Sequence, residues 1–283
     1  MIHEFLDSWG LFGNTYVVGW LVCAALAIIG VLVVARNQVF AGAALSQAST
    51  LGIAAAMWAG MMFGGAAEKW SESDAFLTGV SIAVSLLAAL LTGGTFGQRR
   101  ESREAIMAWL FLLGASGAIV MVSHSPHGLE EVQRLLSSSI IGASGKDVLV
   151  FSALLGATVL GMIVWWRPLL FWVMDPATAQ AAGVRVRTVE TLTSLWLGLG
   201  VGLSIRSSGM IYTFGCLVLP ALIAKSLCRE VRKMFIVAPV AGVVLSLLAF
   251  VLANHFDYPP AQMAVAVQCV GLVFAWGWRA VVR

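Results

Sequence analysis

A succession of apolar runs separated by short polar connections limits what this chain can fold into. A helix needs roughly 20 apolar residues to cross a bilayer, and only helices and closed barrels satisfy their own backbone groups in lipid. We therefore predict an all-α, polytopic membrane protein with about 8–9 transmembrane helices, forming a single domain over residues 1–283. The runs fall at about 15–35, 39–63, 76–94, 105–122, 147–166, 188–205, 209–224, 234–253 and 261–278.

The composition supports a membrane protein and excludes several other classes. The chain is 60% hydrophobic and 11% charged, whereas soluble domains carry roughly 25% charged residues. Its net charge of +3 is scattered between apolar runs, so no nucleic-acid surface is expected. The four cysteines show no CxxC spacing and are interpreted as packing residues. Without HExxH, GxSxG or P-loop motifs, the chain is not expected to be an enzyme, and any ATP chemistry would belong to a partner.

The basic residues predict the orientation. If the N-terminus lies outside, 13 of the 17 Lys and Arg residues fall on the inner side, as the positive-inside rule requires. The C-terminus is then cytoplasmic. Residues 1–12 place apolar side chains at helical spacing opposite two acidic ones, which predicts a short helix lying in the membrane interface.

The segment 175–187 is the most helix-like polar interruption. Asp175 is a good N-cap, Pro176 suits the first helical position, and Gly183 suits a left-handed end. We predict a helix of about two turns, too short to span a bilayer, on the cytoplasmic side. Such a helix could contact a soluble partner, or it could be a plain amphipathic connector.

A second feature lies in the run 40–52, which is rich in Gly, Ala, Ser and Thr. Small residues let helices approach closely, and this alone could explain them. Gln47 is explained less well by packing, because an amide in lipid should face a neighbour or a water-filled path. A short apolar element at 135–142 and an interruption at 206–209 add the broken segments that are typical of transport paths.

Imidazoles and carboxylates gather on the predicted outer side, where they could concentrate divalent cations. Ordinary polar loops would look the same. The metal-ligating candidates are His124, Glu130, His255 and Asp257.

Three blocks resemble the integral-membrane permeases of bacterial ABC importers for zinc, manganese and iron. Gly42 to Gly52 is similar to the family's G-D-A-L-S-H-A-x-L-P-G run. Asp175 to Val184 is similar to D-P-E-x-A-x-x-x-G-V. Gly209 to Ala224 is similar to G-x-L-L-x-x-x-L-L-x-x-P-A-x-x-A.

The resemblance implies a multi-pass permease of the bacterial inner membrane, paired with a second permease chain, identical or not. It also implies a cytoplasmic ATPase, an extracytoplasmic solute-binding protein and surrounding membrane lipid as partners, with no cofactor bound by this chain. The transported substrate would be zinc, manganese or iron. Segment 175–187 would be the helix that couples the permease to the ATPase, through Asp175, Pro176, Ala179, Gly183 and Arg185. The translocation path would include Ala43, Ser46, Gln47 and Thr50.

The chain departs from the family at the metal-transfer positions. The family's Asp and His, four residues apart on one helical face, correspond here to Ala43 and Gln47. Neither offers an anionic ligand, and a bare dication in a low-dielectric path is unfavourable without one. Three readings stay open: a metal importer with ligands from elsewhere, an importer of a chelated or organic ligand, and a non-transporting partner subunit.

Overall fold

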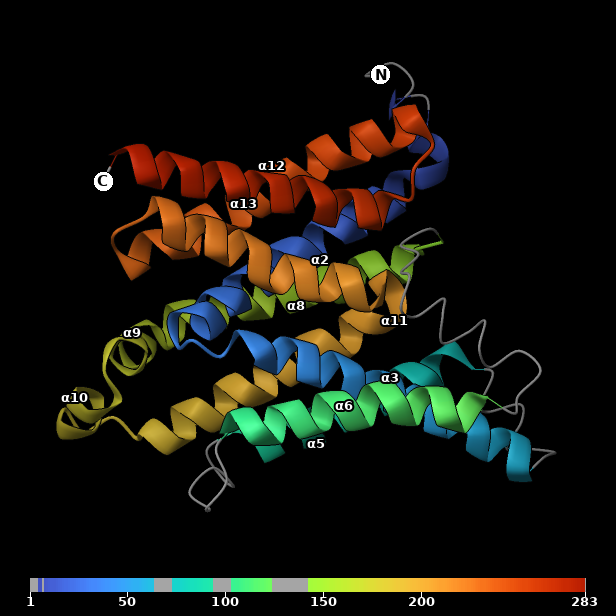
Figure 1. Cartoon of the computed structure of the whole chain (residues 1–283), viewed down its shortest axis with the longest axis horizontal. Helices are drawn as coiled ribbons and strands as arrows, with labels where there is room; N and C mark the ends of the chain where they lie inside the picture. The colour runs from blue at the N-terminus through green and yellow to red at the C-terminus, as the bar shows by residue number, and fades with distance from the viewer. Residues whose placement is uncertain (1–4, 7, 64–72, 94–102, 124–141, 283) are drawn as a thin grey trace. The chain divides into compact units, whose positions relative to one another are not determined.

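The computed structural model describes residues 5, 6, 8–63, 73–93, 103–123 and 142–282 (Figure 1). In these ranges the regular elements are helices, and no strand occurs. The helices are α2 (Trp9–Ala35), α3 (Val39–Phe63), α5 (Asp74–Thr92), α6 (Arg103–Val122), α8 (Gly145–Val164), α9 (Trp166–Met174), α10 (Pro176–Ala181), α11 (Val186–Leu227), α12 (Val231–Phe256) and α13 (Pro260–Val282).

Eight of the described helices are long and apolar enough to cross a membrane. One of them, α11, is 42 residues long and is broken at Gly209, whose φ of 74° and ψ of 169° are not helical. This break falls where the sequence predicted an interruption. The all-α, polytopic fold with about 8–9 transmembrane helices is confirmed.

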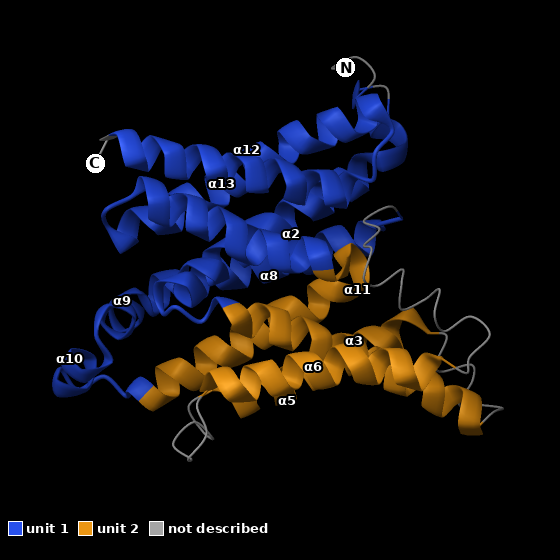
Figure 2. Cartoon of the chain, viewed as in Figure 1, with its two compact units in different colours: residues 1–39, 138–186, 211–283 blue, residues 40–137, 187–210 orange. Residues whose placement is uncertain are grey.

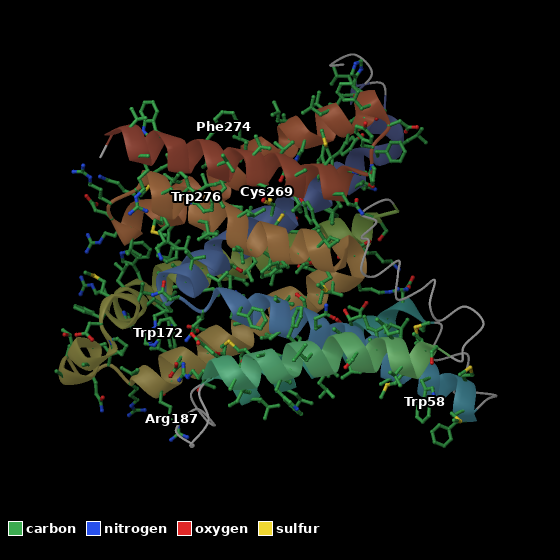
Figure 3. The ribbon with its side chains drawn as sticks, in the orientation of Figure 1. Trp58, Trp172, Arg187, Cys269, Phe274 and Trp276 are labelled. Atoms are coloured by element: carbon green, nitrogen blue, oxygen red, sulfur yellow. The ribbon has the colours of Figure 1, made fainter. Side chains whose placement is uncertain are left out.

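The apolar side chains on the outside of the helices fit a lipid or protein environment. Phe274 and Trp276 on α13 are 75% and 53% exposed (Figure 3). Exposed apolar area of this kind is unfavourable in water and ordinary in a bilayer.

Two predicted segments lie largely outside the described ranges. Of the predicted interfacial helix 1–12, residues 9–12 form the beginning of α2, and most of the remainder is not described. The predicted element at 135–142 falls outside the described residues except for Gly142.

The chain divides into two compact units (Figure 2). Unit 1 comprises residues 1–39, 138–186 and 211–283. In it, α2 packs against α12 and α8, and α12 packs against α13. The Tyr212 hydroxyl donates a hydrogen bond to the Gly19 carbonyl at 2.9 Å, so the second part of α11 is also fixed to α2.

Unit 2 comprises residues 40–137 and 187–210 and holds α3, α5, α6 and the first part of α11. Glycines on α11 bring its backbone against α5. A Cβ atom on Gly202 would lie 2.8 Å from the Cα atom of Ile82, and the Ser81 hydroxyl donates to the Gly202 carbonyl at 2.8 Å. Small residues therefore let α11 and α5 approach closely in unit 2.

Candidate functional site

The helix predicted from the segment 175–187 is present as α10. The Asp175 carboxylate accepts hydrogen bonds from the backbone N–H groups of Ala177 at 3.0 Å and Thr178 at 3.3 Å, and Pro176 occupies the first helical position. Gly183 follows the helix with a φ of 81°, a conformation that favours glycine. Three residues with strong local preferences thus begin and end this helix.

The cap also perturbs the charge at the start of α10. The hydroxyl of Thr178 donates to the Asp175 carboxylate at 2.6 Å. This bond is the main cause that lowers the pKa of Asp175, followed by the bond from the Ala177 N–H group. The carboxylate is therefore ionised at neutral pH, which also suits the positive end of a helix dipole.

Most of α10 faces outward. Ala179 is buried, whereas Ala177, Thr178, Gln180 and Ala181 are exposed. Arg185, immediately before α11, is exposed as well. A short helix with one buried side chain and an exposed remainder can present its surface to a partner.

The support beneath α10 includes residues that the sequence analysis did not single out. Trp172 on α9 is 2% exposed, and the Arg36 guanidinium lies 5.1 Å from the centroid of its ring, a cation–π contact. Arg36 also attracts the Asp175 carboxylate, a minor contribution to its lowered pKa. An Arg directly after an apolar run was the available signal, but its partner could not be found without the fold.

The candidate path residues lie together on the buried part of α3 in unit 2. Ala43 is buried. Ser46 donates to the Gly42 carbonyl at 2.8 Å, and Thr50 donates to the Ser46 carbonyl at 3.1 Å. Both hydroxyl protons are thus used within α3, and each oxygen keeps acceptor capacity.

Gln47 differs from its neighbours. Its side chain is buried, and its Oε1 atom accepts no hydrogen bond from any described residue. The backbone of Gly114 on α6 packs against the backbone of Gln47, because a Cβ atom on Gly114 would lie 2.6 Å from the Gln47 backbone carbonyl oxygen. The Ser85 hydroxyl is a second buried polar group in unit 2 without a partner among the described residues. An unpaired buried acceptor costs about 1–3 kcal/mol, so this arrangement suits a ligand or water that supplies the missing donor.

Buried charge is scarce in the described ranges. Glu190 is the one buried charged residue that they contain, and Arg103 neutralises it in an ion pair between α11 and α6. Arg206 pairs with Asp74, linking α11 to the beginning of α5. The described buried interior therefore offers a cation neutral oxygen ligands and no free carboxylate.

Two of the outer candidates for metal binding, His255 and Asp257, lie in the described residues, and they do not belong to a metal-binding cluster there. His255 lies at the end of α12 and packs edge-to-face on Phe256, and Asp257 ends that helix in a left-handed conformation. Both are exposed. His124 and Glu130 lie outside the described residues. Within the described ranges, no group of three or more His, Cys, Asp or Glu residues is placed to hold a metal ion.

Comparison with known proteins gives consistent matches over nearly the whole chain. A profile described as "ABC 3 transport family" matches residues 9–278. The chain is 24% identical to the chelated iron transport system membrane protein YfeD of Yersinia pestis, over 92% of this chain and 81% of that protein. It is also 24% identical to the manganese transport system membrane protein MntC of Halalkalibacterium halodurans, over 87% and 80%.

A solved structure shows the same fold. It is described as PsaBC from Streptococcus pneumoniae in complex with Fab, and its matched chain superposes with a TM-score of 0.80 at 18% identity, covering 98% of this chain and 95% of that one.

Proposed function

The chain belongs to the ABC 3 transport family, and from this premise we propose that it is the permease subunit of an ATP-driven importer of divalent metal ions in a bacterial inner membrane. ATP hydrolysis would occur on a separate cytoplasmic ATPase, and an extracytoplasmic protein would deliver the substrate. A second permease chain, most simply an identical copy, would complete the path. The N-terminus would lie outside and the C-terminus in the cytoplasm, in keeping with the positive-inside rule.

The proposed substrate is manganese or iron, because relatives with these transport functions match most of the chain. Zinc is implied by the resemblance in sequence alone. The observation that supports a path through unit 2 is the buried Gln47 oxygen without a partner. By the resemblance in sequence, its position on α3, four residues after Ala43, would correspond to that of the family's His.

A chelated metal is the second candidate substrate. A neutral amide oxygen is a weak ligand for a transition-metal ion but can accept a hydrogen bond from an organic chelator. The one buried charged residue of the described ranges, Glu190, is already paired. A path lined in this way would pass a complex of low net charge more readily than a bare dication.

Uptake into proteoliposomes separates these substrates. The permease would be reconstituted with its ATPase and binding protein and supplied with manganese, ferrous iron or zinc, each free and chelated, with and without ATP. ATP-dependent uptake of a free or chelated metal supports the importer. Free-metal uptake that appears only in Ala43→Asp/Gln47→His supports the chelate. Failure of every form with an active ATPase contradicts both substrates.

We propose that α10 is the coupling helix of this permease. Proline cannot adopt the φ of 81° found at Gly183, so Gly183→Pro should distort the end of α10. Strain of this kind costs about 1–3 kcal/mol, and we expect ATPase affinity to fall on the order of tenfold. Gly142→Pro is the matched control, because Gly142 also has a positive φ and open space around it but lies before α8. Equal ATPase binding by the two variants would contradict the coupling role.

A further inference from the structure

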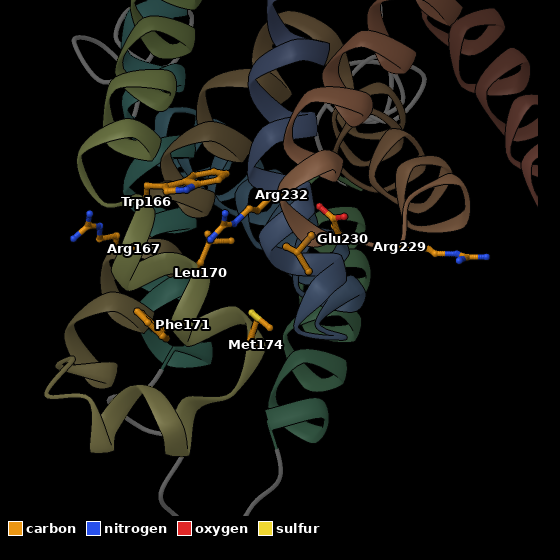
Figure 4. A pocket seen from close by; sticks show the side chains of 9 residues that line it. Trp166, Arg167, Leu170, Phe171, Met174, Arg229, Glu230 and Arg232 are labelled. Carbon is orange, nitrogen blue, oxygen red and sulfur yellow. The ribbon is translucent and has the colours of Figure 1, made fainter.

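A groove in unit 1 lies between α9 and the beginning of α12. Its volume is about 850 Å³, and it adjoins the turn that leads from α9 into α10 (Figure 4). Its floor includes Leu170 and Phe171 of α9, and its rim carries charged residues from both elements. None of these residues is part of the candidate path or of α10.

The rim of the groove is strongly basic. Three arginines line it, Arg167, Arg229 and Arg232. In Figure 4 the guanidinium of Arg232 reaches into the groove, whereas the Arg167 and Arg229 side chains extend outward on opposite sides. The one carboxylate, Glu230, accepts from the Lys233 ammonium group at 3.1 Å. Within the described part of the chain, no residue forms an ion pair with the three arginines. The groove therefore carries uncompensated positive charge and is complementary to an anion.

The groove also has an apolar surface, which a small soluble anion would not contact favourably. Met174 is 76% exposed and Phe171 is 48% exposed, although both line it. In Figure 4, Arg232 reaches from α12 toward Leu170 and Trp166 of α9, so its guanidinium lies over this apolar surface. An occupant that carries an anionic group joined to an apolar chain would satisfy both parts.

The position of the groove fits the surface of a bilayer. The span α8 ends at Val164, and Trp166 follows two residues later. The span α12 begins at Val231, so the groove lies where two spans end. Tryptophan is enriched at this depth, and basic pockets between spans bind anionic headgroups.

We propose that this groove binds an anionic phospholipid, with its headgroup phosphate on Arg232 and an apolar part of the lipid against the side chains of α9. A guanidinium group can bind two phosphate oxygens at once. A zwitterionic headgroup also carries a phosphate, but its positive charge lowers the net attraction to arginine. The bound lipid joins α9 to α12 beside the point where the chain enters α10. The site depends on the membrane position of the two spans and not on the transported substrate.

Native mass spectrometry of the purified permease can test this site. The protein would be titrated with equimolar phosphatidylglycerol and phosphatidylcholine, and the affinity of the first bound lipid measured. One basic residue near a membrane surface contributes a free energy that corresponds to about fivefold in affinity, so Arg232→Gln should lower phosphatidylglycerol affinity about fivefold. Arg279→Gln removes an equal charge from the last turn of α13, at the same end of unit 1 as the start of α12, and should change it little.

Four results would overturn the proposal. They are equal affinity of the unmodified protein for the two lipids, an equal effect of the two substitutions, no loss of phosphatidylglycerol affinity in Arg232→Gln, and displacement of the lipid by millimolar inorganic phosphate, which would indicate a site for free anions. If Arg232→Gln leaves lipid affinity unchanged and weakens ATPase binding, the groove is a docking site for the ATPase. An unchanged melting temperature shows that a lower lipid affinity is not caused by unfolding, and Phe171→Ser should then weaken lipid binding without changing the charge.

Discussion

The two compact units join their helices through different polar groups. In unit 1 these groups join separate helices: Gln268 on α13 donates to the Ser246 hydroxyl on α12 at 3.0 Å, and Tyr212 on α11 donates to α2. In unit 2 several hydroxyls donate back to their own helix four residues earlier, as Ser46 and Ser204 do at 2.8 and 2.7 Å. Unit 1 contains such hydroxyls too, at Thr158 and Ser226. Unit 2 joins its helices through the Ser49 and Ser81 hydroxyls and through two ion pairs.

These bonds affect how easily the helices of each unit can move past one another. Hydrogen bonds between helices resist relative movement, and unit 1 also carries α10. Helices that meet through small side chains and self-satisfied hydroxyls have fewer polar bonds to break when they move. Unit 2 has several bonds between its helices as well, because Ser49 donates to the Ser81 carbonyl of α5 and Ser81 donates to Gly202 of α11. The units therefore differ in the groups that join their helices, with small serines and ion pairs in unit 2 and larger polar side chains in unit 1.

The largest expected effect compares one glycine from each unit. A Cβ atom on Gly30 would collide with the backbone carbonyl of Leu217, whereas a Cβ atom on Gly117 would meet the flexible end of Leu51. Gly30→Ala should therefore destabilise the protein by about 3 kcal/mol. Gly117→Ala should change stability by less than about 1 kcal/mol, because alanine favours the helix and the Leu51 side chain can move. Melting temperatures in detergent would check both, and equal values would contradict the close backbone packing of α2 on α11 at Gly30.

The second comparison concerns the two ion pairs within unit 2. Glu190 and Arg103 have side chains 11% and 29% exposed, whereas Asp74, which pairs with Arg206, is 84% exposed. Glu190→Gln should cost about 2 kcal/mol, because a largely buried guanidinium loses its charged partner. Asp74→Asn should cost less than about 1 kcal/mol.

The charge-reversed double variant Arg103→Glu/Glu190→Arg provides the control. It should recover most of the lost melting temperature if the pairing itself is responsible. A double variant that is less stable than Glu190→Gln would show that local packing, not the ion pair, stabilises this end of α11.

Substitution of either of the two buried glutamines should change stability less, but the two substitutions should differ in their effect on uptake. Gln268 in unit 1 donates to Ser246 through Nε2, although its Oε1 atom, like that of Gln47, accepts no hydrogen bond from a described residue. Hydrogen bonds between membrane helices contribute about 0.6 kcal/mol on average. Gln268→Leu should therefore lower the melting temperature slightly and preserve uptake. Gln47→Leu in unit 2 removes an oxygen that no described residue binds, so stability should be kept and uptake lost. The reverse pattern would contradict the assignment of the path to unit 2.

The sequence predicted what local chemistry determines. The span lengths, the interruption near Gly209 and the capped helix α10 depend on residues a few positions apart, and all three are present. Contacts between distant segments could not be predicted, among them the Arg36–Trp172 contact beneath α10. The sequence singled out Gln47 as polar, but only the packing of α3 in unit 2 shows that its oxygen has no described partner.

The smallest expected effect is the titration of the α10 cap. Hydrogen bonds from Thr178 and Ala177 lower the pKa of Asp175 from the ordinary value of 3.8. A carboxyl group with a lowered pKa stabilises the folded helix above its unfolded pKa, and this contribution is lost as the pH falls through the folded pKa. Between pH 6 and pH 8 the cap is fully ionised, so α10 should show no pH dependence there. Amide hydrogen exchange at residues 176–183, corrected for the intrinsic rate, would measure this.

Substitutions at the same position sharpen the test. Asp175→Asn keeps an oxygen that can accept from the first free N–H groups, and Asp175→Ala removes it. We expect near-normal protection at pH 7 in the Asn variant and faster exchange in the Ala variant. As the pH falls through the pKa of Asp175, which these hydrogen bonds hold below 3.8, the unmodified protein should approach the Asn variant, because its carboxyl group becomes neutral. PH-dependent protection near pH 7, or equal exchange in the two variants, would show that Asp175 does not cap α10 as the structure indicates.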